Sequence, residues 1–273
     1  MPLILWAMPR YTPSQHAALA DEVRREGHCL LPALLPPAVI DRWADAFAPL
    51  LQRHIAEQGH LQNRGSGRYY VTLPFAAPFA DPRVFEDDDI LAVVEHLVGA
   101  DAVFCQLATD TPLLGSEHQA VHRDAPPLFP ETGEETPPFQ LAVNFPLCDI
   151  TVDNGPLEVA RGTHRLPKAE ALLRLEAGQS RLEPVLMKRG DVIVRDVRTL
   201  HRGTPNVTSE PRPMVVLGYS RRWLHRPEVS IRVPRAALRD LCPRARELLR
   251  FNPIVDSFEE AVAGTEVYQS FAY

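Results

Sequence analysis

The chain has 273 residues, a formal net charge of −6 and 45% hydrophobic residues, with a sequence pI near 5.9. This acidic, ordinary globular composition argues against a nucleic-acid partner, which would favour a clustered basic face. The sequence contains no apolar run of about 18 residues that would span a membrane, and its four cysteines lack the spacing of a zinc ribbon or a disulfide framework.

The N-terminus, Met1-Pro-Leu-Ile-Leu-Trp-Ala, has no basic region, and its apolar run is too short for a signal peptide. We therefore expect a soluble cytoplasmic protein, monomeric or homodimeric. Its partner should be a small molecule rather than nucleic acid or membrane. The length is compatible with one domain over 1–273, because large β-sandwiches and barrels commonly form a single domain.

The first hundred residues are predicted to be mostly helical. Thr12 and Gln15 flank a proline in the pattern of a capping box, which predicts a helix start. Apolar residues recur at helical spacing, as in Val39, Trp43 and Phe47. Helices are therefore predicted over three segments that each end before a glycine: 13–26, 37–58 and about 88–98.

From residue 101 onward the pattern changes to short apolar runs separated by Gly, Pro, Asn and Asp. Such runs are typical of short strands joined by turns, which favours a sandwich or barrel over a parallel sheet. Strands are predicted at 102–109, 117–123, 139–147, 156–160, 183–187, 191–196 and 212–222. We expect a β core over about 101–222, with the helices outside it and a helical extension over about 223–273.

Residues 124–138 contain five prolines and little periodicity. They begin at the last residue of His122-Arg-Asp124, a candidate metal-binding tripeptide. Long irregular loops within compact domains are usually functional. We expect this segment to be a mobile lid over the site, with a disordered surface insert as the alternative.

The tripeptide begins with His122 and ends with Asp124. Two imidazoles and one carboxylate on one face of a metal form the ligand set of non-haem Fe(II) oxygenases. With 10 histidines and 35 acidic residues in the chain, a histidine followed two residues later by Asp or Glu is expected about once by chance. The alternative is a histidine at a strand end beside an unrelated acid. We interpret His118 as structural, because a strand would place it too far from the same ion.

A second histidine, His201, follows the apolar run 191–196 and precedes a Gly/Pro/Asn turn. This order would deliver one ligand from another strand, as a three-ligand site requires. Arg212 opens the next apolar run eleven residues later. A buried arginine needs an anion, which its planar guanidinium can bind with two hydrogen bonds. The anion would be a dicarboxylic cosubstrate or a structural Asp or Glu.

Two further motifs accompany these residues, Asp153-Asn-Gly-Pro-Leu-Glu-Val-Ala-Arg-Gly-Thr-His164-Arg165 and Gly190-Asp191. Taken together, the set resembles the phytanoyl-CoA dioxygenase (PhyH) family of Fe(II)/2-oxoglutarate-dependent oxygenases over about 100–222. The resemblance implies a mainly β fold with flanking helices, a double-stranded β-helix or jelly roll.

The resemblance also implies roles for individual residues. His122, Asp124 and His201 would hold Fe(II). Arg212 would bind the distal carboxylate of 2-oxoglutarate, and Gln119, three residues before the first histidine, would contact this cosubstrate. The implied reaction consumes O2 and 2-oxoglutarate, releases succinate and CO2, and most often hydroxylates a small molecule. Asp124 argues against halogenation, because halogenating relatives lack that carboxylate.

The sequence departs from the family at Gly203, where some members carry a hydroxyl group two residues after the distal histidine. Some members also use a basic residue upstream, and Arg68 is the candidate here, with a surface role as the alternative. Gln106 and Asn144 lie in predicted strands and are candidate substrate contacts, although hydrogen-bonded core residues show the same pattern.

The leading interpretation is an Fe(II)/2-oxoglutarate-dependent dioxygenase acting on a small molecule, for instance in secondary metabolism. Leu128, Phe129 and Phe139 around the irregular segment favour a neutral or apolar substrate. A non-catalytic jelly-roll binding protein is the alternative. A zinc hydrolase or cupin isomerase is a third hypothesis, but the sequence lacks His-Glu-x-x-His or a similar motif.

Overall fold

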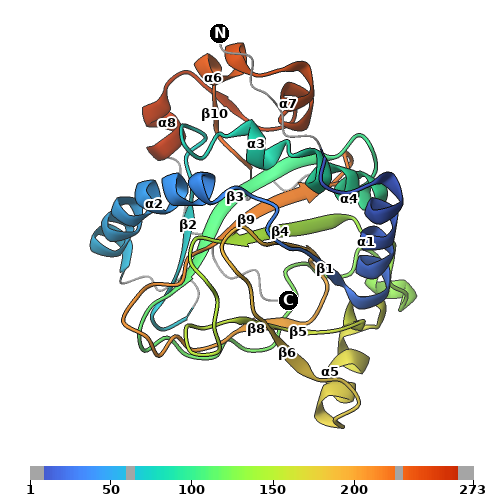
Figure 1. Ribbon diagram of the computed structural model, residues 1–273. Helices are drawn as coiled ribbons and strands as arrows, with labels where there is room; N and C mark the ends of the chain where they lie inside the picture. The colour runs from blue at the N-terminus through green and yellow to red at the C-terminus, as the bar shows by residue number, and fades with distance from the viewer. Residues whose placement is uncertain (1–8, 60–64, 225–229, 264–273) are drawn as a thin grey trace.

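The computed structural model describes residues 9–59, 65–224 and 230–263. An antiparallel six-stranded sheet and a smaller three-stranded sheet form the β core, and the N-terminal helices cover the outer face of the larger sheet (Figure 1). The N-terminal heptapeptide considered above lies outside the described residues.

The three predicted helices are confirmed. Thr12 and Gln15 form the capping box of the first, which ends at Gly27 with a φ of 89°. Gly27 is required for a second reason, because a Cβ there would overlap the side chains of Thr199 and His164. The helices before the central strands are α1 (Pro13–Glu26), α2 (Pro37–Gln58), the short α3 (Pro82–Phe85) and α4 (Asp88–Val98).

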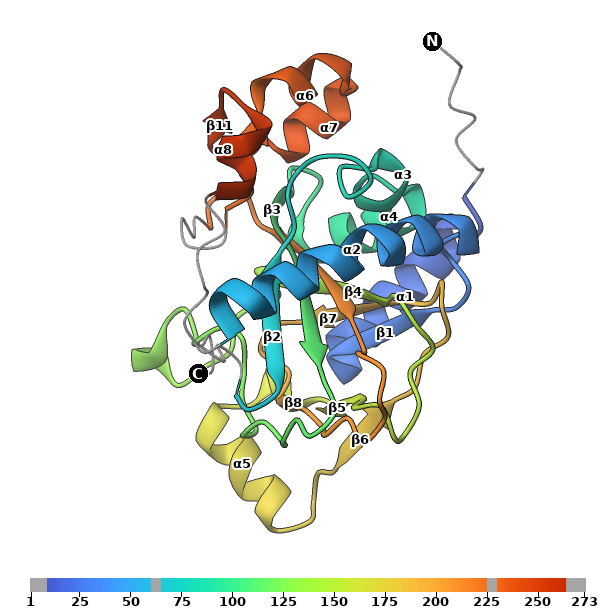
Figure 2. The same cartoon turned by 90° about the vertical axis from the view of Figure 1, so that its left-hand side faces the viewer.

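Apolar helix faces fasten this layer to the large sheet. Trp43 of α2 packs edge-on against Phe145, a sheet residue, with ring centroids 5.2 Å apart. α4 buries most of its length, including Ile90 and Val94. The core therefore lies between the helices and the large sheet, on the side away from the small sheet (Figures 1 and 2).

The large sheet has the strand order β1-β7-β4-β9-β3-β2, with antiparallel neighbours throughout. Its strands are β1 (His28–Leu31), β2 (Arg68–Thr72), β3 (Val103–Pro112), β4 (Gln140–Pro146), β7 (Val192–Asp196) and β9 (Met214–Ser220). The small sheet has the order β6-β5-β8 and consists of β6 (Leu182–Val185), β5 (Leu157–Ala160) and β8 (His201–Gly203). The two-sheet arrangement confirms the jelly-roll prediction.

Peripheral elements lie at both ends of the β core. The helix α5 (Lys168–Glu176) connects β5 to β6 at the end opposite the C-terminal helices (Figure 2). Beyond β9, Asn252 donates a hydrogen bond to the Phe104 carbonyl of β3 at 2.8 Å, which fixes the C-terminal part to the sheet. That part contains β10 (Val233–Pro234), α6 (Arg235–Asp240), α7 (Pro243–Leu248), β11 (Ile254–Val255) and α8 (Phe258–Ala263), with β10 and β11 paired in parallel.

The predicted strand 117–123 is wrong. The N–H groups of Gln119, His122 and Asp124 donate to the carbonyl oxygens of Gly203, His201 and Val197. This spacing is too irregular for a ladder, and only the His122–His201 bridge forms. The short strands β1 and β2 were not predicted.

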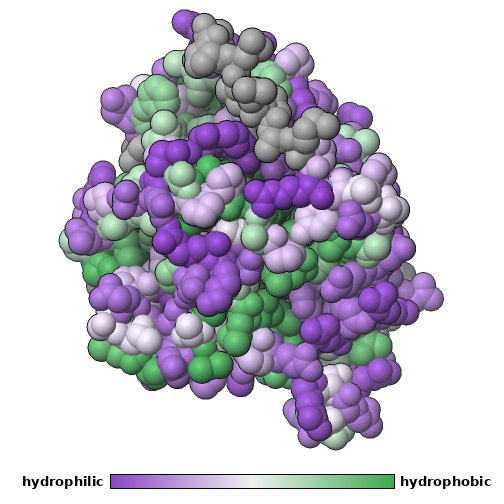
Figure 3. Space-filling view, viewed as in Figure 1, coloured by the Kyte–Doolittle hydropathy of each residue, from purple (hydrophilic) through white to green (hydrophobic). Residues whose placement is uncertain are grey.

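The surface of the face seen in Figure 3 is mostly hydrophilic, with apolar side chains in separate clusters. In the described part of the chain, no helix combines the length and the apolar character that crossing a membrane demands.

Candidate metal and oxoacid site

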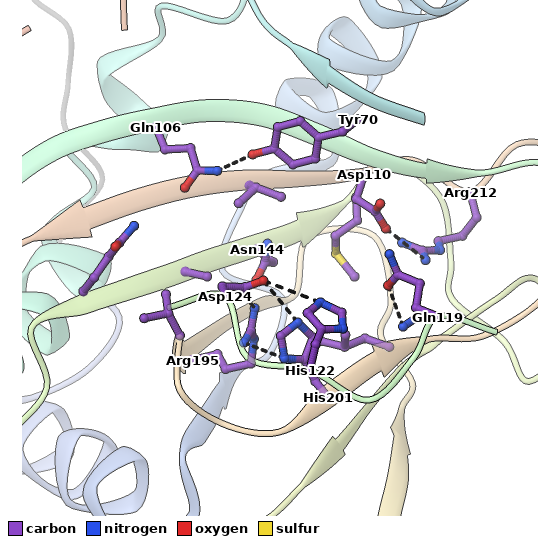
Figure 4. A pocket seen from close by; sticks show the side chains of 17 residues that line it. Tyr70, Gln106, Asp110, Gln119, His122, Asp124, Asn144, Arg195, His201 and Arg212 are labelled. Carbon is purple, nitrogen blue, oxygen red and sulfur yellow. Dashed lines mark hydrogen bonds and ion pairs between the residues drawn. The ribbon is translucent and has the colours of Figure 1, made fainter. Parts of the chain in front are cut away.

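His122, Asp124 and His201 converge in a cavity between the two sheets (Figure 4). His201 begins β8, and His122 lies opposite it in the segment 117–123, outside any strand. Their backbone N–H groups each donate to the other's carbonyl oxygen at 3.0 Å. This reciprocal bridge brings the two imidazole rings to a centroid separation of 4.3 Å.

Backbone contacts orient both imidazoles. His122 Nδ1 lies 2.8 Å from the Ala120 carbonyl oxygen and His201 Nδ1 lies 2.9 Å from that of Thr199. Each Nε2 therefore faces the Oδ1 atom of Asp124, at 3.7 and 3.5 Å. Such backbone hydrogen bonds fix the tautomer of metal-binding histidines. Within the described ranges, this is the one group of three His, Cys, Asp or Glu side chains close enough to hold an ion.

The ionisation of these groups also favours a metal. Burial, assisted by the neighbouring His201, lowers the pKa of His122 to about 4. Burial alone would raise the pKa of Asp124, but His201 and Arg195 hold it well below its ordinary value. Neutral imidazole and ionised carboxylate are the metal-binding forms. The donor set thus fits a divalent metal such as Fe(II), with positions left for other ligands.

Arg212 lines the same cavity and is 2% exposed. Its Nη2 donates to the Gly155 carbonyl oxygen at 2.6 Å and lies 3.9 Å from Oδ2 of Asp110, whereas its Nε has no hydrogen-bond partner among the described residues. Burial lowers the pKa of Arg212 to about 10; Asp110 opposes this shift and Arg68 adds to it. Arg212 is thus an incompletely neutralised buried cation, which fits an anionic ligand.

Arg68 lies beside Arg212, so its alternative role on the surface is wrong. It is 1% exposed, its Nη1 is 2.7 Å from Oδ2 of Asp110, and its Nη2 donates to the Thr204 carbonyl oxygen at 2.7 Å. A Cβ at Gly203 would overlap the Arg68 guanidinium. Arg68 therefore fills the space of a side chain at position 203. Because Arg68 is not among the cavity-lining residues, it lies behind the wall at the Arg212 end.

The other predicted contact residues all line the cavity. Gln119 accepts a hydrogen bond from the Gly203 N–H at 2.9 Å. Gln106 follows a β-bulge in β3 and donates to the Tyr70 hydroxyl. Asn144 donates from Nδ2 to the Val215 carbonyl oxygen at 3.1 Å, while its buried Oδ1 has no partner in the described part of the structure.

Sequence reasoning missed four polar residues that line this cavity: Tyr70, Asp110, Gln140 and Arg195. Tyr70 belongs to the unpredicted strand β2, and Asp110 lies just beyond the predicted end of β3. Arg195 occupies a recognised strand, but a single basic residue in an apolar run carries no signal of its position near a metal. His118 is exposed and lies outside the ligand group.

The segment 124–138, expected to be a mobile lid, does not cover the cavity in this conformation, since none of residues 125–138 lines it. Glu135 lies between two buried arginines, 2.8 Å from Arg123 and 3.2 Å from Arg198. Leu128 packs against a buried cluster that includes Phe139. In this conformation the segment is therefore anchored beside the site.

The chain matches known proteins in sequence and in fold. The family model described as phytanoyl-CoA dioxygenase (PhyH) matches residues 23–214, which is more than half of the chain. The chain belongs to the PhyH family. A curated relative, the iron/alpha-ketoglutarate-dependent dioxygenase penM of Penicillium thymicola, is 27% identical over 135 residues. The match covers 48% of this chain and 42% of penM, so the chain spans less than half of that relative's length.

Solved structures show the same fold as this PhyH-family chain. The non-heme alpha-ketoglutarate-dependent epimerase SnoN from nogalamycin biosynthesis has 22% identity and a TM-score of 0.58, with 77% of this chain and 84% of SnoN covered. EctD from S. alaskensis with bound Fe has 21% identity and a TM-score of 0.59, with 81% and 82% covered.

Proposed function

We propose that this PhyH-family chain is an Fe(II)/2-oxoglutarate-dependent dioxygenase that oxidises, most often by hydroxylation, a small molecule in secondary metabolism. The observation that carries the proposal is one cavity lined by both the His122–Asp124–His201 group and the buried cation Arg212. The naming of SnoN for nogalamycin biosynthesis supports the metabolic setting.

The residues divide the work of binding. His122, Asp124 and His201 would hold Fe(II), which with 2-oxoglutarate and O2 supplies the oxidant and releases succinate and CO2. Arg212 would bind the distal carboxylate of 2-oxoglutarate, and Gln119 would line the space between the metal and Arg212. Asp110 neutralises Arg68, so the two buried arginines and this carboxylate carry one net positive charge, which matches one carboxylate of the cosubstrate.

The other end of the cavity is proposed to take the substrate. Tyr70, Gln106 and Asn144 present neutral hydrogen-bonding groups there, among apolar side chains such as Val197 and Val216. This composition supports a neutral substrate with polar groups to recognise. We also propose that residues 1–273 form one oxygenase domain, because the C-terminal part is hydrogen-bonded to β3.

The test is succinate formation from 2-oxoglutarate under air with Fe(II). The wild-type protein should form succinate, slowly without substrate and faster with the right one, whereas His122→Ala should not. His118→Ala is the matched control, because His118 is exposed and four residues away. Full turnover by His122→Ala would contradict the ligand assignment.

A non-catalytic jelly-roll binder is the competing function, and the presence of three metal donors together with Arg212 argues against it. Such a binder would be stabilised by metal and 2-oxoglutarate without consuming O2. Oxygen uptake measured beside the thermal shift therefore distinguishes the two functions.

A further inference from the structure

Arg195 makes contacts in the site that no role assigned above explains. It lies in β7, is 4% exposed and lines the cavity. Its Nη2 lies 2.6 Å from Oδ2 of Asp124, and its Nη1 lies 3.2 Å from Nδ1 of His201. One guanidinium therefore contacts two of the three proposed metal ligands (Figure 4).

The two oxygens of the Asp124 carboxylate face different partners. Oδ1 faces the Nε2 atoms of His122 and His201, whereas Oδ2 faces Arg195. A charge-assisted hydrogen bond of this length is among the strong ones in proteins. It restricts rotation of the carboxylate and leaves a single oxygen directed at the metal position.

The sheet does not require this guanidinium. β7 is held by backbone pairing with β1 and β4, in which Arg195 lies opposite His28 and Ala142. The Arg195 Nε has no hydrogen-bond partner among the described residues. The side chain thus buries a charge whose strong hydrogen bond is made to Asp124 at the metal site.

We propose that Arg195 is a positioning residue for the metal centre. It turns the Asp124 carboxylate so that Oδ1 alone is directed at the metal position, and it occupies the space into which Oδ2 would otherwise rotate. The inference rests on the proposed metal site but not on the identity of the substrate.

The direction in which removal of Arg195 changes metal affinity tests this proposal. A guanidinium beside a divalent cation repels it, so removing Arg195 would tighten metal binding if charge alone mattered. If orientation of Asp124 dominates, removal weakens metal binding, and loss of such outer contacts typically costs about 10–100-fold in metal affinity.

The experiment compares metal affinity in wild-type protein, Arg195→Met and Arg195→Lys by calorimetric titration with Co(II), without cosubstrate. We expect the Met variant to bind about 10–100-fold more weakly and the Lys variant to lie between Met and wild type. The Co(II) absorption spectrum of Arg195→Met should also change, because Asp124 is free to bind through both oxygens. Arg202→Met is the matched control: it removes an arginine next to His201 whose partner, Glu158, does not line the cavity, so its Co(II) affinity should stay at the wild-type value.

Unchanged or tighter Co(II) binding by Arg195→Met, with an unchanged spectrum, would overturn the proposal. If that variant does not fold, Arg195→Gln takes its place, and wild-type affinity in Arg195→Gln would have the same meaning. Failure of the wild-type protein itself to bind Co(II) would instead refute the proposed function.

Discussion

Replacing Gly203 by serine tests the contact between β8 and Arg68. Gly203 lies outside the left-handed backbone region, so a side chain there meets no backbone strain, but its Cβ would overlap the Arg68 guanidinium. Arg68 cannot move aside cheaply, because it is 1% exposed and bonded to both Asp110 and the Thr204 carbonyl. We therefore expect Gly203→Ser to destabilise the protein.

The size of the effect follows from the two ways in which the overlap can be relieved. Overpacking a buried site costs about 1–3 kcal/mol, and separating a buried ion pair costs about 3–5 kcal/mol. The less costly route, overpacking, sets the result, and the overlap involves three atoms of the guanidinium. We therefore expect the upper part of that range, about 2–3 kcal/mol less free energy of unfolding. With an unfolding entropy of about 2.1 cal/mol/K per residue, this corresponds to a fall in Tm of about 4–5 °C for a chain of this size.

The assay is urea denaturation of a double-mutant cycle made of Gly203→Ser, Arg68→Ala and their combination. In the Arg68→Ala background the serine has space, so its cost should fall below about 1 kcal/mol, which gives a coupling of at least about 1 kcal/mol. Gly59→Ser is the control, because Gly59 has a φ of −59° and a Cβ there makes only ordinary contacts. An equal cost of serine in both backgrounds would refute the reasoning.

Three further predictions concern single side chains. A ligand at 100 times its Kd stabilises the state it binds by about 2.7 kcal/mol. Arg212→Met should lose most of the stabilisation that 2-oxoglutarate adds in the presence of Mn(II), and a retained thermal shift would contradict the role of Arg212 in binding 2-oxoglutarate. Glu135→Gln leaves Arg123 and Arg198 without their shared carboxylate, so the free energy of unfolding in urea should fall by about 3–5 kcal/mol, and wild-type stability would show that this buried pair is dispensable. Burial, with Arg161 and Arg195, lowers the pKa of His28 to about 4. On acidification, the His28 imidazole of the unfolded chain therefore binds a proton at a higher pH than that of the folded chain does. The contribution of neutral His28 to the free energy of unfolding is complete above about pH 6.5 and is lost as the pH falls towards 4, at up to about 1.4 kcal/mol per pH unit. His28→Gln should therefore reduce the dependence of the free energy of unfolding in urea on pH over this range, and an unchanged dependence would contradict the lowered pKa of His28.

The helices were predictable because their ends are encoded locally. Thr12 and Gln15 cap α1, and Gly27 ends it by a backbone conformation that the sequence pattern indicates. The strand prediction at 117–123 failed because the backbone of this segment bonds to β8 at the irregularly spaced positions Gln119 and His122 instead of forming a ladder. β1 and β2 were missed because they lie in the first hundred residues, where the helical periodicity of the flanking segments dominated the prediction, and because their partners β7 and β3 are distant in the sequence.

The proposed ligands could be chosen from the sequence because histidine and aspartate at that spacing, with a later histidine and arginine, form a joint pattern. Asp110 and Arg195 could not, since their importance comes from which strands lie next to each other. Arg195 reaches Asp124 across 71 positions of the chain. Likewise, the Arg68 side chain of β2 fills the space that a side chain at Gly203 of β8 would occupy, and only the folded chain brings these residues together.

The most direct test of the central claim is an anaerobic titration of the protein with Fe(II) and 2-oxoglutarate, followed by visible absorption and by bound iron. The proposed site predicts one iron per chain and a charge-transfer band that requires both iron and 2-oxoglutarate. Asp124→Ala should lose both signals, whereas Arg212→Met should keep the iron and lose the band at cosubstrate concentrations that saturate the wild type. Wild-type protein that binds neither iron nor 2-oxoglutarate, or an Asp124→Ala variant that keeps both signals, would contradict the account.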